Sequence, residues 1–320
     1  MAEQQTDQKD YSFDFRGSEL NINMTPDNMP PEEINRAASG VVSCSRQQIQ
    51  GAQIRLSIDS VIVEEPLQIR LIYQEQSGKE QDRIYLVTMR TPGDDVNLVT
   101  GLLLAEGVIK SATDIIGINT QLDDDEISIN EINVHLCPNV VVDWDFIKRD
   151  TTSFSSCGVC GKSSMQSLEL RDIPRLDSAE AWLSSHIIGQ FSEQLAQVQS
   201  MFKQTGGVHG CALFDEAGQL LLNSEDVGRH NALDKLLGRL AATPELDTQR
   251  KIVFLSGRIS FELVQKVLVA GIPILAAVGA PSNLAINMAK RFNLTLIGFS
   301  RDGSFNLYHG AFRLNLATSE

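Results

Sequence analysis

The sequence predicts an α/β protein with a smaller α+β domain in its first half and a larger α/β domain in its second half. Strand-like runs surround an apolar helical run between residues 51 and 150, and strands alternate with helices between residues 178 and 320. The length of 320 residues fits about two domains. We expect four segments, namely a mobile tail (1–50), the α+β domain (51–150), a flexible loop with a following helix (151–177) and the α/β domain (178–320).

The first half contains the elements of the α+β domain. Residues 1–50 are polar and show no sustained hydrophobic period, which favours a mobile tail. The Asp94-Asp95 pair precedes an apolar run at 96–104, which predicts a capped helix. This helix is expected to end near Gly107. Runs of apolar residues predict the strands of this domain, at 57–63, 67–73, 84–89, 115–118 and 127–136.

The second half has a different order of predicted elements, in which strands and helices alternate. Apolar residues at helical spacing predict one long helix from about residue 178 to residue 202, which Gly206-Gly207 ends. A β-hairpin is expected next, with strands at 208–214 and 219–222. The remaining elements alternate, with a helix from 231, a strand at 251–255, a helix at 261–270, a strand at 274–278, a helix at 282–292 and a strand at 294–299. Such alternation implies right-handed crossovers and a largely parallel sheet with helices on both faces.

Composition argues against several classes of function. A surface with a formal net charge of −14 repels nucleic acid and anionic membranes, so neither is expected as a partner. The first residues lack the pattern of a secretory signal, and the longest apolar stretch, near 272–278, is too short for membrane insertion. Five irregularly spaced cysteines do not suggest a disulfide framework. We therefore expect a cytoplasmic protein, in which an exposed Cys-x-x-Cys is more often catalytic or metal-binding than structural.

The Cys157-Gly158-Val159-Cys160 segment lies in a polar stretch that offers no core packing. Residues 163–170 are expected to form a helix, and a cysteine just before a helix N-terminus is favoured as a thiolate. Four interpretations stay open at this point: a structural zinc knuckle, a thioredoxin-type redox pair, a persulfide carrier, and two incidental exposed cysteines. The zinc knuckle would need a second ligand pair, and the redox pair would normally follow a strand.

Three polar loops leave the carboxyl ends of consecutive predicted strands, at 256–260, 279–283 and 300–304. In open parallel sheets, ligands bind beyond these strand ends. The first two loops also open helices, whose free amides suit an anionic group. Arg258 and Arg301 supply local positive charge. The loops therefore favour a nucleotide or another phosphorylated ligand, and the alternative is ordinary turn and capping chemistry.

Two histidines, His209 and His230, are candidates for the same cleft as these loops. His230 belongs to a polar loop-to-helix junction, and it shares a helix face with Asp234, four residues later. His209 begins a predicted strand and is expected to line the same cleft. The alternative is that both are satisfied structural histidines, which are more frequent than ligand-binding ones.

These segments together resemble the FdhD family of sulfur carriers needed for formate dehydrogenase activity. The resemblance runs from about residue 55 to the C-terminus. It is carried by Met89-Arg90-Thr91-Pro92-Gly93-Asp94-Asp95, Leu103-Leu104-Ala105-Glu106-Gly107, Ser156-Cys157-Gly158-Val159-Cys160-Gly161, Thr205-Gly206-Gly207-Val208-His209, the run from Asp226 to Lys235, and Ser256-Gly257-Arg258. It implies a sulfurtransferase that takes persulfide sulfur from a cysteine desulfurase and delivers it to a bis(molybdopterin guanine dinucleotide) molybdenum cofactor.

The resemblance also implies a fold and site residues. The larger domain is expected to be a three-layer, cytidine-deaminase-like α/β/α domain, and the protein is expected to form a homodimer. Cys157 is expected to carry the persulfide with Cys160 as its partner. The family's cofactor-binding stretch falls on Phe299, Ser300, Arg301, Asp302, Gly303 and Ser304. With the neighbouring loops, the candidate cofactor-binding set also includes Ser256, Gly257, Arg258, His209, His230 and Asn283.

Deaminase chemistry is not expected from this chain. That chemistry needs a zinc-bound water and a glutamate two residues after a ligand histidine. His209 is followed at that spacing by Cys211, and the Cys-x-x-Cys lies upstream of it, so no zinc is expected. Two competing functions are a nucleotide-binding protein with a redox-active Cys-x-x-Cys and a zinc hydrolase.

Overall fold

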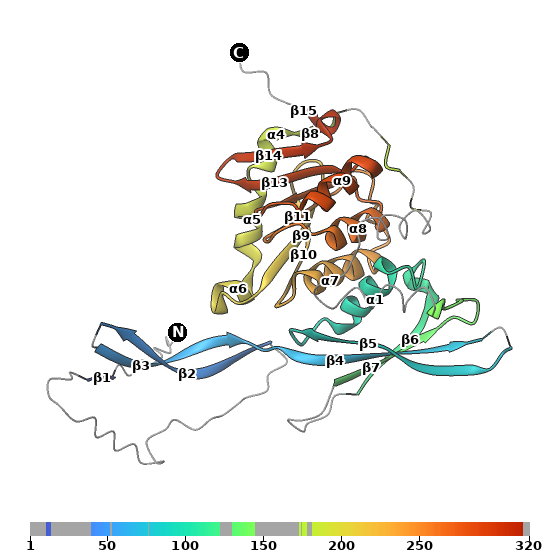
Figure 1. Cartoon of the computed structure of the whole chain (residues 1–320), viewed down its shortest axis with the longest axis horizontal. Helices are drawn as coiled ribbons and strands as arrows, with labels where there is room; N and C mark the ends of the chain where they lie inside the picture. Colours follow the sequence, from blue (N-terminus) through green and yellow to red (C-terminus); the bar gives the residue numbers. More distant parts are fainter. Residues whose placement is uncertain are drawn as a thin grey trace, which may run out of the picture.

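The computed structural model describes residues 11–13, 40–51, 53–75, 77–121, 130–144, 173, 175–177 and 181–315. Cys157, Cys160 and the helix expected at 163–170 lie outside the described residues. Figure 1 shows the larger domain above a long β-ribbon, with helix α1 between them. No helix in the described ranges is long and apolar enough to cross a membrane.

The larger domain is built on one six-stranded sheet of order β10-β9-β11-β12-β13-β14. Its strands are β9 (His209–Phe214), β10 (Leu220–Asp226), β11 (Ile252–Leu255), β12 (Ile274–Ala277), β13 (Thr295–Arg301) and β14 (Ser304–His309). The neighbours β11, β12 and β13 are parallel, whereas β10 and β9 on one side and β14 on the other pair antiparallel. The β9–β10 hairpin is confirmed, but the sheet is mixed and not largely parallel as predicted.

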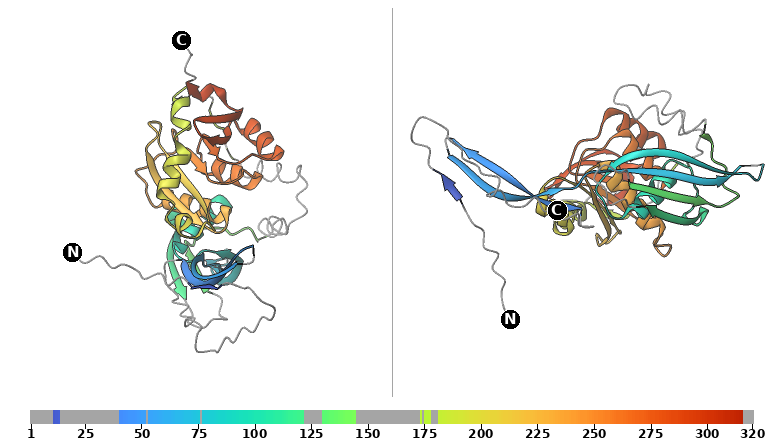
Figure 2. Two further views of the ribbon diagram at one scale, coloured as in Figure 1. Left: turned by 90° about the vertical axis from the view of Figure 1, so that its left-hand side faces the viewer. Right: turned by 90° about the horizontal axis from the view of Figure 1, so that it is seen from below.

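Helices cover both faces of this sheet because its strands alternate in side-chain direction. Helices α7 (Arg229–Ala241), α8 (Phe261–Val269) and α9 (Asn283–Phe292) pack on the face that holds Cys211 and Leu213. Helices α4 (Ser185–Ile188) and α5 (Phe191–Val198) cover the face that holds Ala212 and Phe214. Figure 2 shows the three resulting layers from the side. A short parallel pair, β8 (Leu183–Ser184) and β15 (Leu314–Asn315), borders the second face.

The single helix predicted over 178–202 is wrong. The described part of this region forms β8, α4 and α5, followed by α6 (Ser200–Thr205). The backbone leaves the helix at Gln199, whose ψ is 83°. This break frees the amides of Met201 and Phe202, which donate to the Glu225 carboxylate over 3.0 and 2.9 Å. The contact with Glu225 therefore stabilises the break at Gln199. The spacing of apolar residues in the sequence carries no information about such a contact.

The smaller domain is a four-stranded sheet of order β5-β4-β7-β6 with α1 on one face. Its elements are β4 (Glu65–Gln74), β5 (Glu80–Arg90), α1 (Asp95–Ala105), β6 (Ile115–Gln121) and β7 (Asn130–Leu136). Leu67, Ile69 and Leu71 of β4 are buried against α1, as the apolar alternation of β4 predicts. The described residues of this region therefore form a mixed sheet with one helix packed on it.

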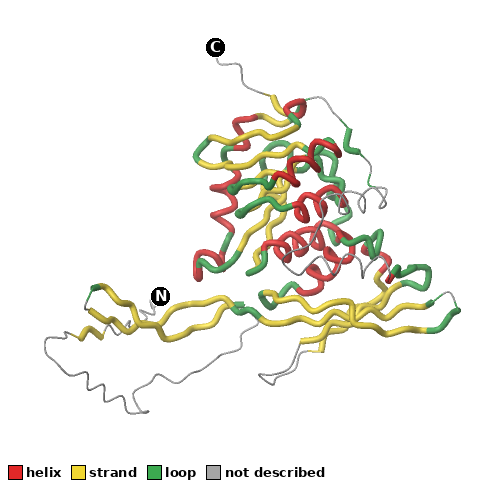
Figure 3. The backbone as a smooth tube through the Cα atoms, viewed as in Figure 1, coloured by secondary structure: helices red, strands yellow, loops and turns green. Residues whose placement is uncertain are grey.

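An arm built on a three-stranded sheet of order β1-β3-β2 extends from this domain. Strands β2 (Val41–Gln50) and β3 (Gln53–Ile62) pair antiparallel, and β1 (Tyr11–Phe13) pairs with the other edge of β3. Figure 3 shows the arm as yellow strands that project beyond the larger domain. Residues 41–50 were predicted to belong to a mobile tail, but they form strand β2. Most of β2 is exposed, so its sequence lacks the apolar period of a buried strand.

Candidate functional site

The loops that follow β11 and β12 lie side by side at one edge of the sheet. The Gly279 amide donates to the Gly257 carbonyl over 3.0 Å. The Ile259 amide donates to the Ala280 carbonyl over 3.0 Å. A Cβ built on Gly279 would lie 2.6 Å from the Gly257 carbonyl oxygen, so this approach requires glycine. The two predicted loops therefore form one surface.

The third loop joins this surface through β13. The Phe299 amide donates to the Gly279 carbonyl over 3.2 Å. Beyond it, Asp302 (φ 52°) and Gly303 (φ 75°) form the turn that leads into β14. This loop is therefore a tight hairpin, and it opens no helix. Asp-Gly is one of the preferred dipeptides of such turns, because both positions need a positive φ.

Phe299 and Ser300 differ in what they offer to a ligand. Phe299 has a φ of 54°, a conformation that is rare for a bulky residue, and its side chain is 41% exposed. Ser300 is buried, and its hydroxyl donates to the Ile188 carbonyl over 3.2 Å. Ser300 therefore attaches β13 to α4, whereas Phe299, Arg301, Asp302 and Ser304 are exposed at the edge.

Several other predicted loop residues have structural partners. The Ser256 hydroxyl accepts a hydrogen bond from the Gly210 amide over 2.9 Å, which ties β11 to β9. The Asn283 side chain accepts from the next amide, that of Leu284, over 2.8 Å. These two residues fit the interpretation of turn and capping chemistry. Arg258 is exposed at the same edge.

The two predicted histidines lie along this edge. A Cβ at Gly257 would approach His209 Nδ1 to 3.2 Å, so the imidazole lies against the first loop. His230 Nε2 is 3.2 Å from the Ser260 hydroxyl and 3.9 Å from the Glu262 carboxylate. Burial, helped by Arg229 and Arg258, lowers the pKa of His209. Burial, helped by Arg229 and Lys266, lowers the pKa of His230 to about 4. Both imidazoles are therefore neutral at neutral pH.

A pH titration checks the state of His230. Because its folded-state pKa lies below the ordinary value of 6.5, protonation favours the unfolded chain. The contribution of His230 to stability is therefore complete above pH 6.5 and is lost as the pH falls toward about 4. NMR of the imidazole carbons is expected to show His230 still neutral at pH 5.5. A midpoint near 6.5 for His230 would contradict the expectation.

Some residues of the polar run from Asp226 to Lys235 face the loop edge, and others are buried. His230 faces the loop edge, but Asp234 is buried, and its Oδ1 lies 2.8 Å from Lys266 Nζ. Lys266 also lies 3.3 Å from Glu106 of the smaller domain. Burial lowers the pKa of Lys266, but the two carboxylates outweigh it, so the net direction is upward. The expected shared face of His230 and Asp234 therefore does not form one site.

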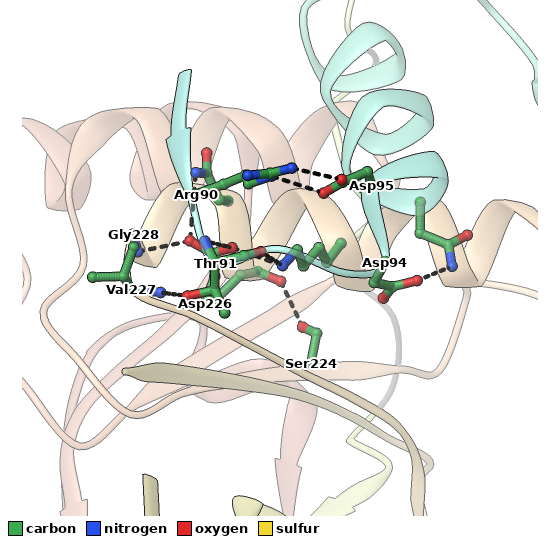
Figure 4. Close-up of polar contacts among 12 residues, drawn as sticks. Arg90, Thr91, Asp94, Asp95, Ser224, Asp226, Val227 and Gly228 are labelled. Atoms are coloured by element: carbon green, nitrogen blue, oxygen red, sulfur yellow. Dashed lines mark hydrogen bonds and ion pairs between the residues drawn. The ribbon is translucent and has the colours of Figure 1, made fainter. Parts of the chain in front are cut away.

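Thr91, Asp226 and Lys235 form a buried bracket between the domains. Figure 4 shows Thr91 and Asp226 of this bracket. The Thr91 amide donates to Asp226 Oδ2 over 3.1 Å, and the Val227 amide donates to the Thr91 hydroxyl over 3.0 Å. Lys235 Nζ lies 2.7 Å from Asp226 Oδ2 and donates to the Thr91 carbonyl over 2.9 Å. Thr91 and Asp226 are completely buried, and Lys235 is only 2% exposed. This bracket was not predicted from the sequence.

Asp94 and Asp95, at the start of α1, were predicted to cap the helix, but their side chains form ion pairs with other elements. Asp94 occupies the N-cap position, but its side chain makes no capping bond there. Asp94 Oδ2 lies 2.7 Å from Arg239 Nε of α7. Asp95 pairs with Arg90, whose guanidinium is buried. Both carboxylates are thus used in ion pairs, one of them between the domains.

The three described cysteines are separate from the loop edge. Cys211 is buried in β9, and burial raises the pKa of its thiol, so it is a poor nucleophile. Cys44 is exposed on the arm and Cys137 is partly exposed after β7. Within the described part of the chain, no group of three or more His, Cys, Asp or Glu side chains is placed to hold a metal ion.

Arg229 is a site residue that the sequence interpretation missed. Its Nε is buried and has no hydrogen-bond partner among the described residues, and its charge acts on both His209 and His230. Its position directly after Gly228, at the first residue of α7, is the sequence signal that could have identified it. Arg229, Arg258, His209 and His230 thus provide cationic and neutral donors at one edge of an acidic protein.

Three comparisons relate the chain to known proteins. The family model described as FdhD/NarQ family matches residues 62–315. The sulfur carrier protein FdhD of Streptomyces avermitilis is 40% identical over 263 residues, which cover 81% of this chain and 90% of the relative. Its namesake from Mycobacterium tuberculosis is 39% identical over 274 residues, covering 81% and 95%. The crystal structure of a candidate formate dehydrogenase accessory protein from Desulfotalea psychrophila is similar with a TM-score of 0.63 at 25% identity, covering 86% of this chain and 99% of that one.

Proposed function

The chain belongs to the FdhD/NarQ family, and on this premise we propose that it is a sulfur carrier for formate dehydrogenase. The observation that carries the proposal is the family match over residues 62–315, a range that includes the Cys-x-x-Cys and all three strand-end loops. The cytidine-deaminase-like fold of the larger domain and the homodimer are part of the same proposal. The three-layer arrangement around the six-stranded sheet supports the fold.

The proposed chemistry is a thiol relay on Cys157. Its thiolate attacks the outer sulfur of a persulfide on a cysteine desulfurase, the sulfur–sulfur bond to the desulfurase cysteine breaks, and that cysteine leaves as a thiolate. Cys157 then carries the outer sulfur as a persulfide. The molybdenum cofactor, which is the cargo used by formate dehydrogenase, would then accept the outer sulfur with its own electron pair. The sulfur–sulfur bond breaks in this step, and Cys157 returns to a thiolate. Cys160 is proposed to stabilise or reduce the persulfide.

The loop edge is the proposed place for the guanine nucleotide ends of the cofactor. It lies beyond the carboxyl ends of three parallel strands, where open α/β sheets bind ligands. Exposed Arg258 and Arg301 suit phosphate groups, and exposed Phe299 offers an aromatic face to a base. The hydroxyls of Ser256 and Ser300 already have protein partners, so we assign these two residues to support of the surface.

Persulfide formation tests the proposed relay. The full chain is incubated with a cysteine desulfurase and cysteine, and intact-protein and peptide mass spectrometry locate any added sulfur. We expect the adduct on Cys157 and its complete loss in Cys157→Ala. Cys211→Ala is the matched control and is expected to retain the adduct, because the Cys211 thiol is buried.

Other outcomes support the competing functions. An adduct that persists in Cys157→Ala rejects the assignment of the carrier residue. A chain that binds guanosine diphosphate (GDP) but never gains sulfur supports a nucleotide-binding protein with a redox-active cysteine pair. One zinc ion per chain, found by metal analysis of the purified protein, supports the zinc hydrolase.

A further inference from the structure

We propose that Thr91 of the smaller domain is a positioning residue for Arg229 and His230 at the loop edge of the larger domain. The inference rests on the proposed function, because it assumes that this edge binds the cargo. The effect of Thr91 on Arg229 and His230 is indirect. Thr91 is hydrogen-bonded to Asp226 and Val227, which belong to the three residues that lead into α7.

The segment before Arg229 depends on Thr91 for its hydrogen bonds. The Val227 amide donates to the Thr91 hydroxyl over 3.0 Å. The Gly228 amide donates to Asp226 Oδ1 over 2.8 Å, and Asp226 Oδ2 accepts from the Thr91 amide over 3.1 Å. The carboxylate of Asp226 therefore connects the Thr91 backbone to the residue that caps α7.

A second contact fixes the same segment against the same strand. Asn231 Nδ2 donates to the Met89 carbonyl over 2.8 Å, and Thr88 Oγ1 lies 3.4 Å from Asn231 Oδ1. Arg229 and His230 therefore lie between two points, Val227 and Asn231, that are both bonded to the end of β5 and the residue after it. A displacement of the smaller domain would shift the start of α7 directly.

The Thr91 hydroxyl is the one part of this bracket that can be removed without changing its shape. Valine has nearly the same volume, and it keeps the Thr91 amide and carbonyl bonds, which belong to the main chain. The Val227 amide, which is partly buried, then loses its acceptor. The segment is expected to relax toward another acceptor, and Arg229 and His230 move with it.

The test compares Thr91→Val with Thr91→Ser and Asp94→Asn in the full chain. Serine keeps the hydroxyl, and Asp94→Asn weakens a different contact between the domains, the pair with Arg239. We measure GDP affinity by calorimetry, the NMR signal and titration of His230, and thermal unfolding. Thr91→Val is expected to weaken GDP binding about tenfold and to shift the His230 signal. Thr91→Ser and Asp94→Asn are expected to leave both readouts close to those of the unsubstituted protein.

Three results would overturn the inference. In the first, Thr91→Val keeps the His230 signal and the GDP affinity. In the second, Asp94→Asn changes both as much as Thr91→Val does, which would mean that general domain stability is responsible. In the third, the Val227 amide of the unsubstituted protein exchanges with solvent as fast as an exposed amide, a measurement that does not depend on folding of the valine variant. If GDP fails to bind the unsubstituted protein, the proposed ligand is wrong, and the His230 signal alone decides the role of Thr91.

Discussion

Replacing Gly238 with alanine is expected to destabilise the protein by about 3 kcal/mol, because α1 and α7 cross with their backbones in contact. A Cβ on Gly238 would lie 1.9 Å from the Asn97 carbonyl oxygen, and one on Gly101 would lie 1.9 Å from the Asp234 carbonyl oxygen. Backbone atoms of a helix cannot move aside as a flexible side chain can. Alanine also gains about 1 kcal/mol of helix propensity over glycine, so the estimate is net of that gain.

Equilibrium unfolding in urea measures the effect of Gly238→Ala, and Gly101→Ala is expected to act in the same direction. The matched control is Gly117→Ala in β6, where a Cβ would meet no atom within 4 Å. This control is expected to change the free energy of unfolding by less than about 0.5 kcal/mol. If all three variants unfold at the same urea concentration as the unsubstituted protein, the close crossing of α1 and α7 is wrong.

The elements with a buried apolar face could be predicted from the sequence. The helix predicted at 261–270 corresponds to α8, and the strand predicted at 274–278 corresponds to β12, each within one residue. In the arm, β3 overlaps the strand predicted at 57–63, but β2 was missed because it is mostly exposed and carries no apolar period. β14 was missed because Asp302-Gly303 was interpreted as part of a ligand loop, although the same dipeptide is a strong hairpin signal.

The candidate site could be predicted only in part. The order of strands predicts that their terminal loops share an edge, and the hydrogen bonds of Gly257 and Gly279 show that the first two do. The sequence did not show which residues between Asp226 and Lys235 face the loop edge and which are buried. That division depends on Thr91, which is more than a hundred residues away in the chain and reaches the run only through domain packing.

Replacing Lys235 with methionine is expected to destabilise the protein by about 3–5 kcal/mol, because the Asp226 carboxylate would be left buried without its ion-pair partner. Lys235 is only 2% exposed, and Asp226 is completely buried. Lys235 Nζ also donates to the Thr91 carbonyl, so the same change removes a hydrogen bond between the domains. Methionine keeps most of the side-chain volume, so the loss reports the charge and its hydrogen bonds.

The control is Arg46→Met, which removes an ion pair of similar length on the arm. Arg46 Nη1 lies 2.6 Å from Asp59 Oδ2, but both side chains are exposed, at 49% and 38%. Water screens such a pair, so its removal is expected to cost no more than about 1 kcal/mol. Urea unfolding of both variants compares the two environments directly. Equal, small losses would show that water reaches the Asp226–Lys235 pair, and the domains would then be held together mainly by the α1–α7 crossing.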